Sequence, residues 1–345
     1  MSATAMSTDT ATMQQDRCDI HCLDRISPLL QEEQRGPDWL ELALQTAVSI
    51  EFSTIPPYLS ALWSIKDPLH PVATSIRNVV QEEMLHMALA CNMLTGLGRV
   101  PHINDPNMVP SYPGRIPGGV HAELVVSLAG LSDATLDTFI EIESPLTGNG
   151  AETPGHKTIG AFYDAIRQEF RTLKPKLSTE RQVSGPLAYI VMADLDAVET
   201  GINLIVNQGE GSEASPEVKR THELAHYYRF LEIKRRRRIS GIANGRPIFE
   251  GAPVEFPEVW PMAAVPQGGY PKKDVPADVW EMIHAVDEGF TLLLDQLQVV
   301  WEHGDQAALV HAIETMFGLS EQARRLMSIE IGTGRGNYGP CFRVL

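Results

Sequence analysis

The chain has 345 residues, 43% hydrophobic and 21% charged, enough material for one large globular domain or two modest ones. Its formal net charge of -16 argues against nucleic acid or an anionic membrane surface as the main partner. No apolar run is long enough to span a bilayer, and the N-terminus lacks the features of a signal peptide. We therefore expect a soluble, cytoplasmic protein. Residues 1–28 are polar and lack periodicity, which predicts a disordered tail.

From Trp39 to Ile65 apolar residues recur at helical spacing, which predicts a long helix. Glu51 falls inside the apolar stripe of that helix. Pro56 and Pro57 follow about one turn later, where we expect a kink or a local break.

A second helix is predicted to run to about Leu97 after a short turn. Glu83 and His86 are three residues apart on its apolar face, where a carboxylate is costly to bury unless a partner neutralises it. Two helices joined by a short turn pack antiparallel. At ~1.5 Å of rise per residue, Glu51 and Glu83 then lie at nearly the same height.

The remainder of the chain alternates irregular and helical segments. Pro and Gly crowd two long predicted loops, at 99–120 and 239–274. Helices are predicted at about 122–129, 132–142, 159–170, 185–208, 276–303 and 305–328, and another is predicted to start at Ser215-Pro216-Glu217 and to carry THELAHYYRFLEI. The helix at 185–208 carries Glu199 on its apolar stripe, and the next one carries Glu223 and His226 in the same spacing as Glu83 and His86.

A single Glu-x-x-His pattern occurs about once by chance in a chain with 11 histidines. Glu281 and His284 form a third instance, on a polar helix face, and we expect them to be solvated. The first two pairs instead lie on apolar helix faces. Each of their helices is paired with the preceding helix in the chain, which can supply another glutamate. This is the ligand layout of a ferritin-like dinuclear metal site, and its oxygen and nitrogen donors suit iron or manganese.

Three glutamates are candidates for the ligand from the third bundle helix. Glu199 lies in the middle of the predicted helix at a compatible height, Glu210 lies just beyond its end, and Glu143 precedes Ser144 and Pro145 in an earlier segment. Geometry slightly favours Glu199. The predicted fold is all-α: a ferritin-like four-helix bundle with inserted loops at 29–240, followed at 241–345 by a Pro/Gly-rich loop and a helical pair packed on the bundle.

Four stretches resemble the ferritin-like domain of iminophenyl-pyruvate dimer synthase proteins: AVSIEFSTIPPYLSALWSI, QEEMLHMALACNMLTGLGRVPHI, INLIVNQGEGS and ELAHYYRFLEI. The resemblance covers about residues 45–235, and GNYGPCF near the C-terminus is similar to the family's closing segment. It implies a non-haem metal site with ligands at Glu51, Glu83, His86, Glu223 and His226. It also implies Glu210, in the QGEG segment, as the third-helix ligand instead of Glu199.

These observations together predict a di-iron oxidase or oxygenase that uses O2 on a small organic substrate, possibly derived from an amino acid. The metal pair is two Fe ions, with Mn or mixed Fe/Mn left open. Tyr58, seven residues after Glu51, is expected to face the same cavity and is the candidate catalytic side chain. Alternatives are a ferroxidase without an organic substrate and a catalytically silent binding protein. Homo-oligomers are possible.

Overall fold

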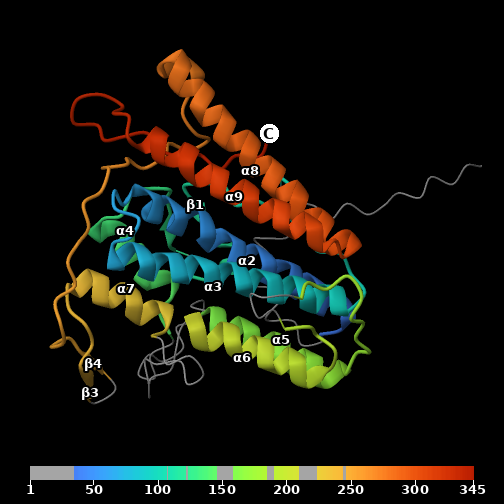
Figure 1. Ribbon diagram of the computed structural model, residues 1–345. Coiled ribbons are helices and arrows are strands. Elements are labelled where there is room, and N and C mark those ends of the chain that lie inside the picture. Colours follow the sequence, from blue (N-terminus) through green and yellow to red (C-terminus); the bar gives the residue numbers. More distant parts are fainter. Residues whose placement is uncertain are drawn as a thin grey trace, which may run out of the picture.

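A computed structural model describes residues 35–106, 108–121, 123–145, 158–184, 190–209, 224–243 and 246–345. Its centre is an antiparallel pair of long helices, α2 (Pro37–Ser64) and α3 (Pro71–Gly96) (Figure 1). Each begins with a proline in its first turn, where the missing N–H costs no hydrogen bond. The His70 side chain accepts a hydrogen bond from Val72 N and caps α3. The predicted pairing of these helices is present.

The two prolines within α2 do not end the helix, which runs without interruption to Ser64. A break was expected because Pro57 has no N–H to donate to the carbonyl of Ser53 four residues earlier. That carbonyl instead accepts a hydrogen bond from the Tyr112 hydroxyl at 2.6 Å. The Tyr112 side chain thus supplies the hydrogen bond that Pro57 removes.

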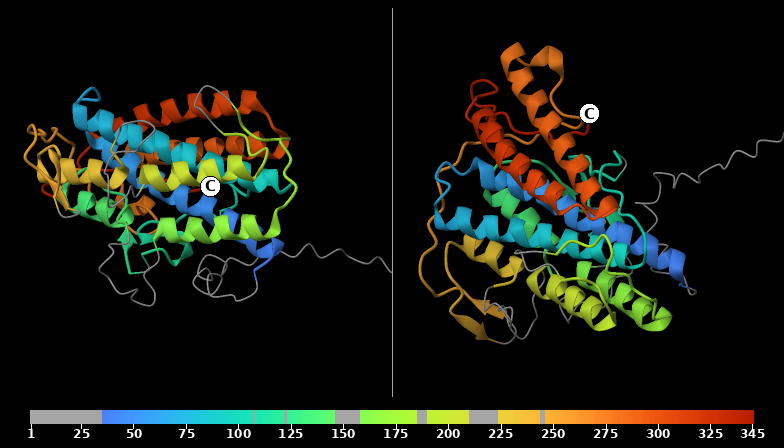
Figure 2. Two further views of the ribbon diagram at one scale, coloured as in Figure 1. Left: turned by 90° about the horizontal axis from the view of Figure 1, so that it is seen from below. Right: turned by 45° about the vertical axis from the view of Figure 1, so that its right-hand side comes forward.

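The other half of the bundle consists of four shorter helices. They are α4 (Asp133–Ile142), α5 (Ile159–Leu173), α6 (Leu195–Gly209) and α7 (His226–Arg235). The pair α4 and α7 covers one end of the α2–α3 pair, and α5 with α6 covers the other end (Figures 1 and 2). The ends of these helices that face the middle of the bundle meet the same part of α2 and α3.

Helix α6 begins ten residues later than the predicted start at 185. Side chains hold the backbone just before it in a non-helical path: Gln182 bonds both the N–H and the carbonyl of Met192, and Asn92 donates to the carbonyl of Ile190. The Asp194 side chain then accepts from Ala197 N at the helix start. A local sequence pattern does not reveal these long-range hydrogen bonds.

Helices α8 (Ala277–His303) and α9 (Gln306–Met327) form an antiparallel pair on the opposite face of the α2–α3 pair (Figure 2). Their bounds agree with the predicted ones to within two residues. Gly304 adopts the left-handed conformation between them, with φ of 70°. The C-terminal segment is held on α8 by Arg343, whose Nε donates to the buried Asp287 carboxylate at 2.7 Å.

Strands are short and peripheral among the described residues. Antiparallel pairs join β1 (Gly114–Arg115) to β2 (Val125–Val126) and β3 (Gly241–Ala243) to β4 (Arg246–Ile248). The helix predicted at 122–129 is therefore wrong, because β2 occupies part of it. The predicted all-α class is confirmed, because helices make up most of the described residues. No described helix is long and apolar enough to cross a membrane.

The hydrogen bond from the Tyr112 hydroxyl to the Ser53 carbonyl is expected to stabilise the fold. Tyr112→Phe leaves a buried carbonyl without a donor, and we expect it to lower the free energy of unfolding by about 1–3 kcal/mol. Chemical denaturation measures this loss. In a Pro57→Ala background the restored N–H can satisfy the same carbonyl, so the cost of Tyr112→Phe should fall by at least half. An equal cost in both backgrounds would contradict this account.

Candidate metal centre

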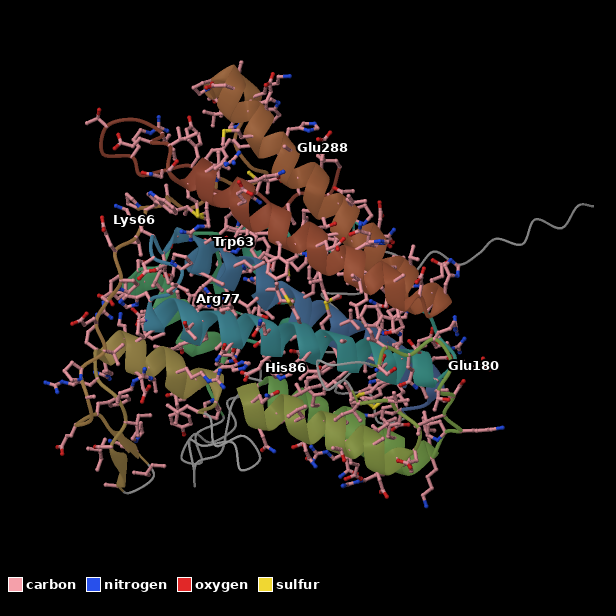
Figure 3. The ribbon with its side chains drawn as sticks, viewed as in Figure 1. Trp63, Lys66, Arg77, His86, Glu180 and Glu288 are labelled. Atoms are coloured by element: carbon pink, nitrogen blue, oxygen red, sulfur yellow. The ribbon has the colours of Figure 1, made fainter. Side chains whose placement is uncertain are left out.

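Helices α2 and α3 bring three sequence-predicted side chains together in the buried middle of the bundle. His86 Nδ1 lies 3.5 Å from a carboxylate oxygen of Glu51 and 3.7 Å from one of Glu83. All three residues are at most 3% exposed. They form the first cluster, in which each side chain offers one atom to a common point. Figure 3 shows His86 on the side of α3 that faces α6.

A second cluster shares Glu83 with the first and adds Glu143 and His226. His226 Nδ1 lies 2.8 Å from a Glu83 oxygen and 3.6 Å from a Glu143 oxygen. Glu143 directly follows α4, and His226 is the first residue of α7. The ends of two short helices therefore deliver these ligand-type side chains to the same place as the middle of α2 and α3.

The other ring nitrogen of each histidine contacts a different kind of partner. His86 Nε2 lies 2.9 Å from the side-chain oxygen of Gln208, near the end of α6. His226 Nε2 lies 2.7 Å from a carboxylate oxygen of Glu82, whose second oxygen accepts from Arg229 at 3.1 Å. Both rings are thus held with Nδ1 pointing into the clusters, an orientation typical of metal-binding histidines.

Two buried tyrosines complete the surroundings of the carboxylates. The Tyr58 hydroxyl donates to Glu143 at 2.6 Å, and the Tyr163 hydroxyl on α5 donates to Glu51 at 2.7 Å. Tyr58 was predicted to face the site, and it does. Tyr163 was not singled out from the sequence, because nothing in its amphipathic helix distinguishes it from an ordinary core tyrosine.

Burial raises the pKa of the Glu51 and Glu143 carboxyls, and for both the nearby Glu83 charge adds to the rise. Burial also acts to raise the pKa of Glu83, but the two histidines outweigh it and hold that pKa well below its usual range. For His86 burial lowers the pKa, yet hydrogen bonds to Glu51 and Glu83 outweigh this and raise it to about 10. The negative charge at this point attracts protons or other cations strongly.

The side chains at the site fit a metal pair. Three carboxylates and two imidazoles converge in an apolar interior, and His226 Nδ1 is buried without a hydrogen-bond partner among the described residues despite its short distance to Glu83. Beside them is a void of about 10 Å³, about the size of one water, walled partly by Ile159, Ile205 and Val206. Oxygen and imidazole donors of this kind suit iron and manganese.

Other predicted candidates lie elsewhere. The Glu199 side chain points away from the clusters to the surface, where it pairs with Arg171 at 2.7 Å. The mild geometric preference for Glu199 was therefore wrong, because its helix is rotated relative to the assumed stripe. Glu143, the third possibility, joins the site. Glu210 and Glu223 lie outside the described residues. His284 pairs with Glu288 on the exposed side of α8, as expected for a solvated pair.

Comparison with known proteins identifies the family of this fold. The model of the family described as Ferritin-like matches residues 44–235. A solved structure of a ferritin-like protein from Caulobacter vibrioides is similar with a TM-score of 0.63 and 21% identity, over 90% of this chain and 99% of that one. That likeness concerns the fold alone. No curated protein sequence matches the chain significantly. The narrower resemblance to iminophenyl-pyruvate dimer synthase proteins stays a prediction. Because the family match spans more than half of the chain, the protein belongs to the ferritin-like family.

Proposed function

We propose that the protein is a dinuclear metalloenzyme that binds two iron ions and uses O2 to oxidise a small organic substrate. The observation that carries this proposal is the sharing of Glu83 between two buried clusters, each completed by one carboxylate and one histidine. Such sharing suits a pair of ions held side by side. Manganese or a mixed iron and manganese pair would use the same ligands.

In the proposed assignment, Glu51 and His86 would hold one ion, Glu143 and His226 would hold the other, and Glu83 would serve both. Glu143 is a ligand that the family resemblance did not imply, and Glu210, outside the described residues, stays a predicted ligand. Glu223 remains a predicted further ligand. When bound, the iron pair would supply the electrons that reduce O2.

The protein's own residues have two tasks in this scheme. Gln208 and Glu82 fix the imidazole rings so that Nδ1 of each stays directed at the ions. Tyr58 and Tyr163 each hold one carboxylate oxygen through a hydroxyl proton. Burial and the neighbouring carboxylates raise the pKa of both phenols well above the usual value, so these protons stay in place at neutral pH.

The space beside the carboxylates is also consistent with O2 chemistry. A void of about 10 Å³ accommodates about one water-sized molecule, a size that suits a small oxidant. Ile159, Ile205 and Val206 make part of its wall apolar, and apolar surroundings strengthen electrostatic interactions at the site.

Metal content tests the ligand assignment directly. Protein purified after growth with iron is expected to hold about two iron ions per chain, as a ferritin-like carboxylate site does. Glu83→Gln should remove both, because each cluster loses a ligand, whereas Glu143→Gln should remove about one. Glu199→Gln is the matched control and should retain both. If Glu199→Gln lost metal while Glu143→Gln kept it, the assignment would be wrong.

Metal binding should be linked to proton release. The pKa of about 10 at His86 means that this ring is protonated at pH 7 without metal, while a metal ligand must be neutral. Affinity should therefore rise with pH up to about that value and not fall. Anaerobic calorimetric titrations with Fe(II) in buffers of different ionisation enthalpy measure the protons released. His284→Ala, at an exposed histidine, should leave their number unchanged, and His86→Ala should reduce it.

A final measurement separates an oxidase from a ferroxidase or storage protein. After the iron is reduced and O2 admitted, iron per chain at saturation should stay at about two. Uptake of hundreds of iron ions per assembly would favour storage and contradict the enzyme proposal. A protein that binds two ions but consumes no O2 would instead be a silent binding protein.

A further inference from the structure

The two clusters of the candidate metal centre contain the same kinds of side chain. The His86 half consists of Glu51 and His86, the His226 half consists of Glu143 and His226, and Glu83 belongs to both. In each half a tyrosine hydroxyl donates to the carboxylate, at 2.6 or 2.7 Å, and the histidine turns Nδ1 toward carboxylate oxygens. Among the described residues, the two halves differ in kind only behind the histidines.

Behind His226 the partner is a carboxylate. One oxygen of Glu82 lies 2.7 Å from His226 Nε2, and the other accepts from Arg229 at 3.1 Å. Arg229 follows His226 by about one turn of α7, and its Nε donates to the carbonyl of Leu224. Because Arg229 is buried and held at two points, it fixes the position of the Glu82 carboxylate. A carboxylate at the outer nitrogen raises the basicity of a metal-binding imidazole.

Behind His86 the partner is a neutral amide. The side-chain oxygen of the buried Gln208 lies 2.9 Å from His86 Nε2. An amide oxygen can only accept a hydrogen bond, so it keeps the ring proton on Nε2 and leaves Nδ1 free to bind an ion. A hydrogen bond to a neutral acceptor is about half as strong as one to a carboxylate. Gln208 therefore orients His86 but strengthens it as a ligand less than Glu82 strengthens His226.

We propose that Glu82 and Gln208 are positioning residues that set the order in which the two ions bind, so that the His226 half fills first and the His86 half second. This inference rests on the proposed function, because it concerns the ions that the two clusters would hold. The charge of Arg229 offsets that of Glu82 at longer range. The difference therefore arises from the hydrogen bond to His226 and is confined to that half.

Each half can be measured alone. Glu51→Gln removes a ligand from the His86 half and Glu143→Gln removes one from the His226 half, so each variant should retain one ion. Anaerobic calorimetric titration with Fe(II) gives the affinity of the half that remains. We expect Fe(II) to bind about tenfold more tightly to Glu51→Gln than to Glu143→Gln, in line with the effect of outer partners on metal affinity. Equal affinities, or tighter binding by the His86 half, would overturn the proposal.

Exchange of the outer partners tests the cause without changing any further ligand. Added to Glu51→Gln, Glu82→Gln should weaken Fe(II) binding by about tenfold. Added to Glu143→Gln, Gln208→Glu should strengthen Fe(II) binding by about the same factor, since His86 then also faces a carboxylate. Damage to the fold would not produce such a gain. If neither exchange moves the affinity, the outer partners do not set the order.

The matched controls place each exchange in the other background. Glu82→Gln added to Glu143→Gln, and Gln208→Glu added to Glu51→Gln, alter charge near the centre but not behind the remaining histidine. Both should change the Fe(II) affinity much less than the exchanges above. An equal effect in the two backgrounds would show a general change in charge or stability and would contradict the proposal.

Two further measurements complete the test. Glu82→Gln removes a carboxylate partner of Arg229, so its unfolding midpoint shows whether it folds. If it does not fold, Glu82→Gln combined with Arg229→Gln removes both charges and takes its place. Wild-type protein is titrated alongside. If it binds no Fe(II), the proposed function and this inference fail together. If it binds two ions and the exchanges have no effect, the metal centre stands and only the order of filling is wrong.

Discussion

Three carboxylates, Glu51, Glu83 and Glu143, are buried side by side in this bundle, and much of the structure responds to that constraint. Buried carboxylates this close together are stable only when positive charges or hydrogen-bond donors surround them. Two histidines and two tyrosines point at them from four different helices. Helix ends supply two of the side chains, since Glu143 directly follows α4 and His226 is the first residue of α7.

The part of this site that the sequence predicts is the part set by local geometry. Glu51, Glu83 and His86 follow from helical spacing and a short turn, which together fix the relative height of two long helices. His226 follows from its repeated spacing, although its role as a ligand remains a proposal. The α8–α9 pair is equally local, because strong amphipathic patterns define both helices and Gly304 marks the turn.

The part that the sequence does not predict depends on tertiary contacts. Glu143 directly follows a short helix, four residues after the buried Phe139, but no histidine at Glu-x-x-His spacing marks it as a ligand. Glu199 does sit on an apparent stripe, but its helix turns it toward Arg171 and solvent. Similarly, Pro57 disrupts a helix in isolation, and only the distant Tyr112 explains why α2 continues. Each case requires knowledge of a partner far away in the chain.

Glu82 and Glu83 are adjacent on α3 but lie in different environments, and this difference affects the two histidines. Glu83 lies inside the carboxylate group, and Glu82 lies outside it, in contact with His226 and Arg229. The two histidines are therefore not equivalent: His86 faces the neutral amide of Gln208, while His226 faces a carboxylate. A carboxylate partner makes an imidazole a stronger donor than an amide does. Despite the repeated Glu-x-x-His spacing, the two halves of the site would thus hold their ions with unequal strength.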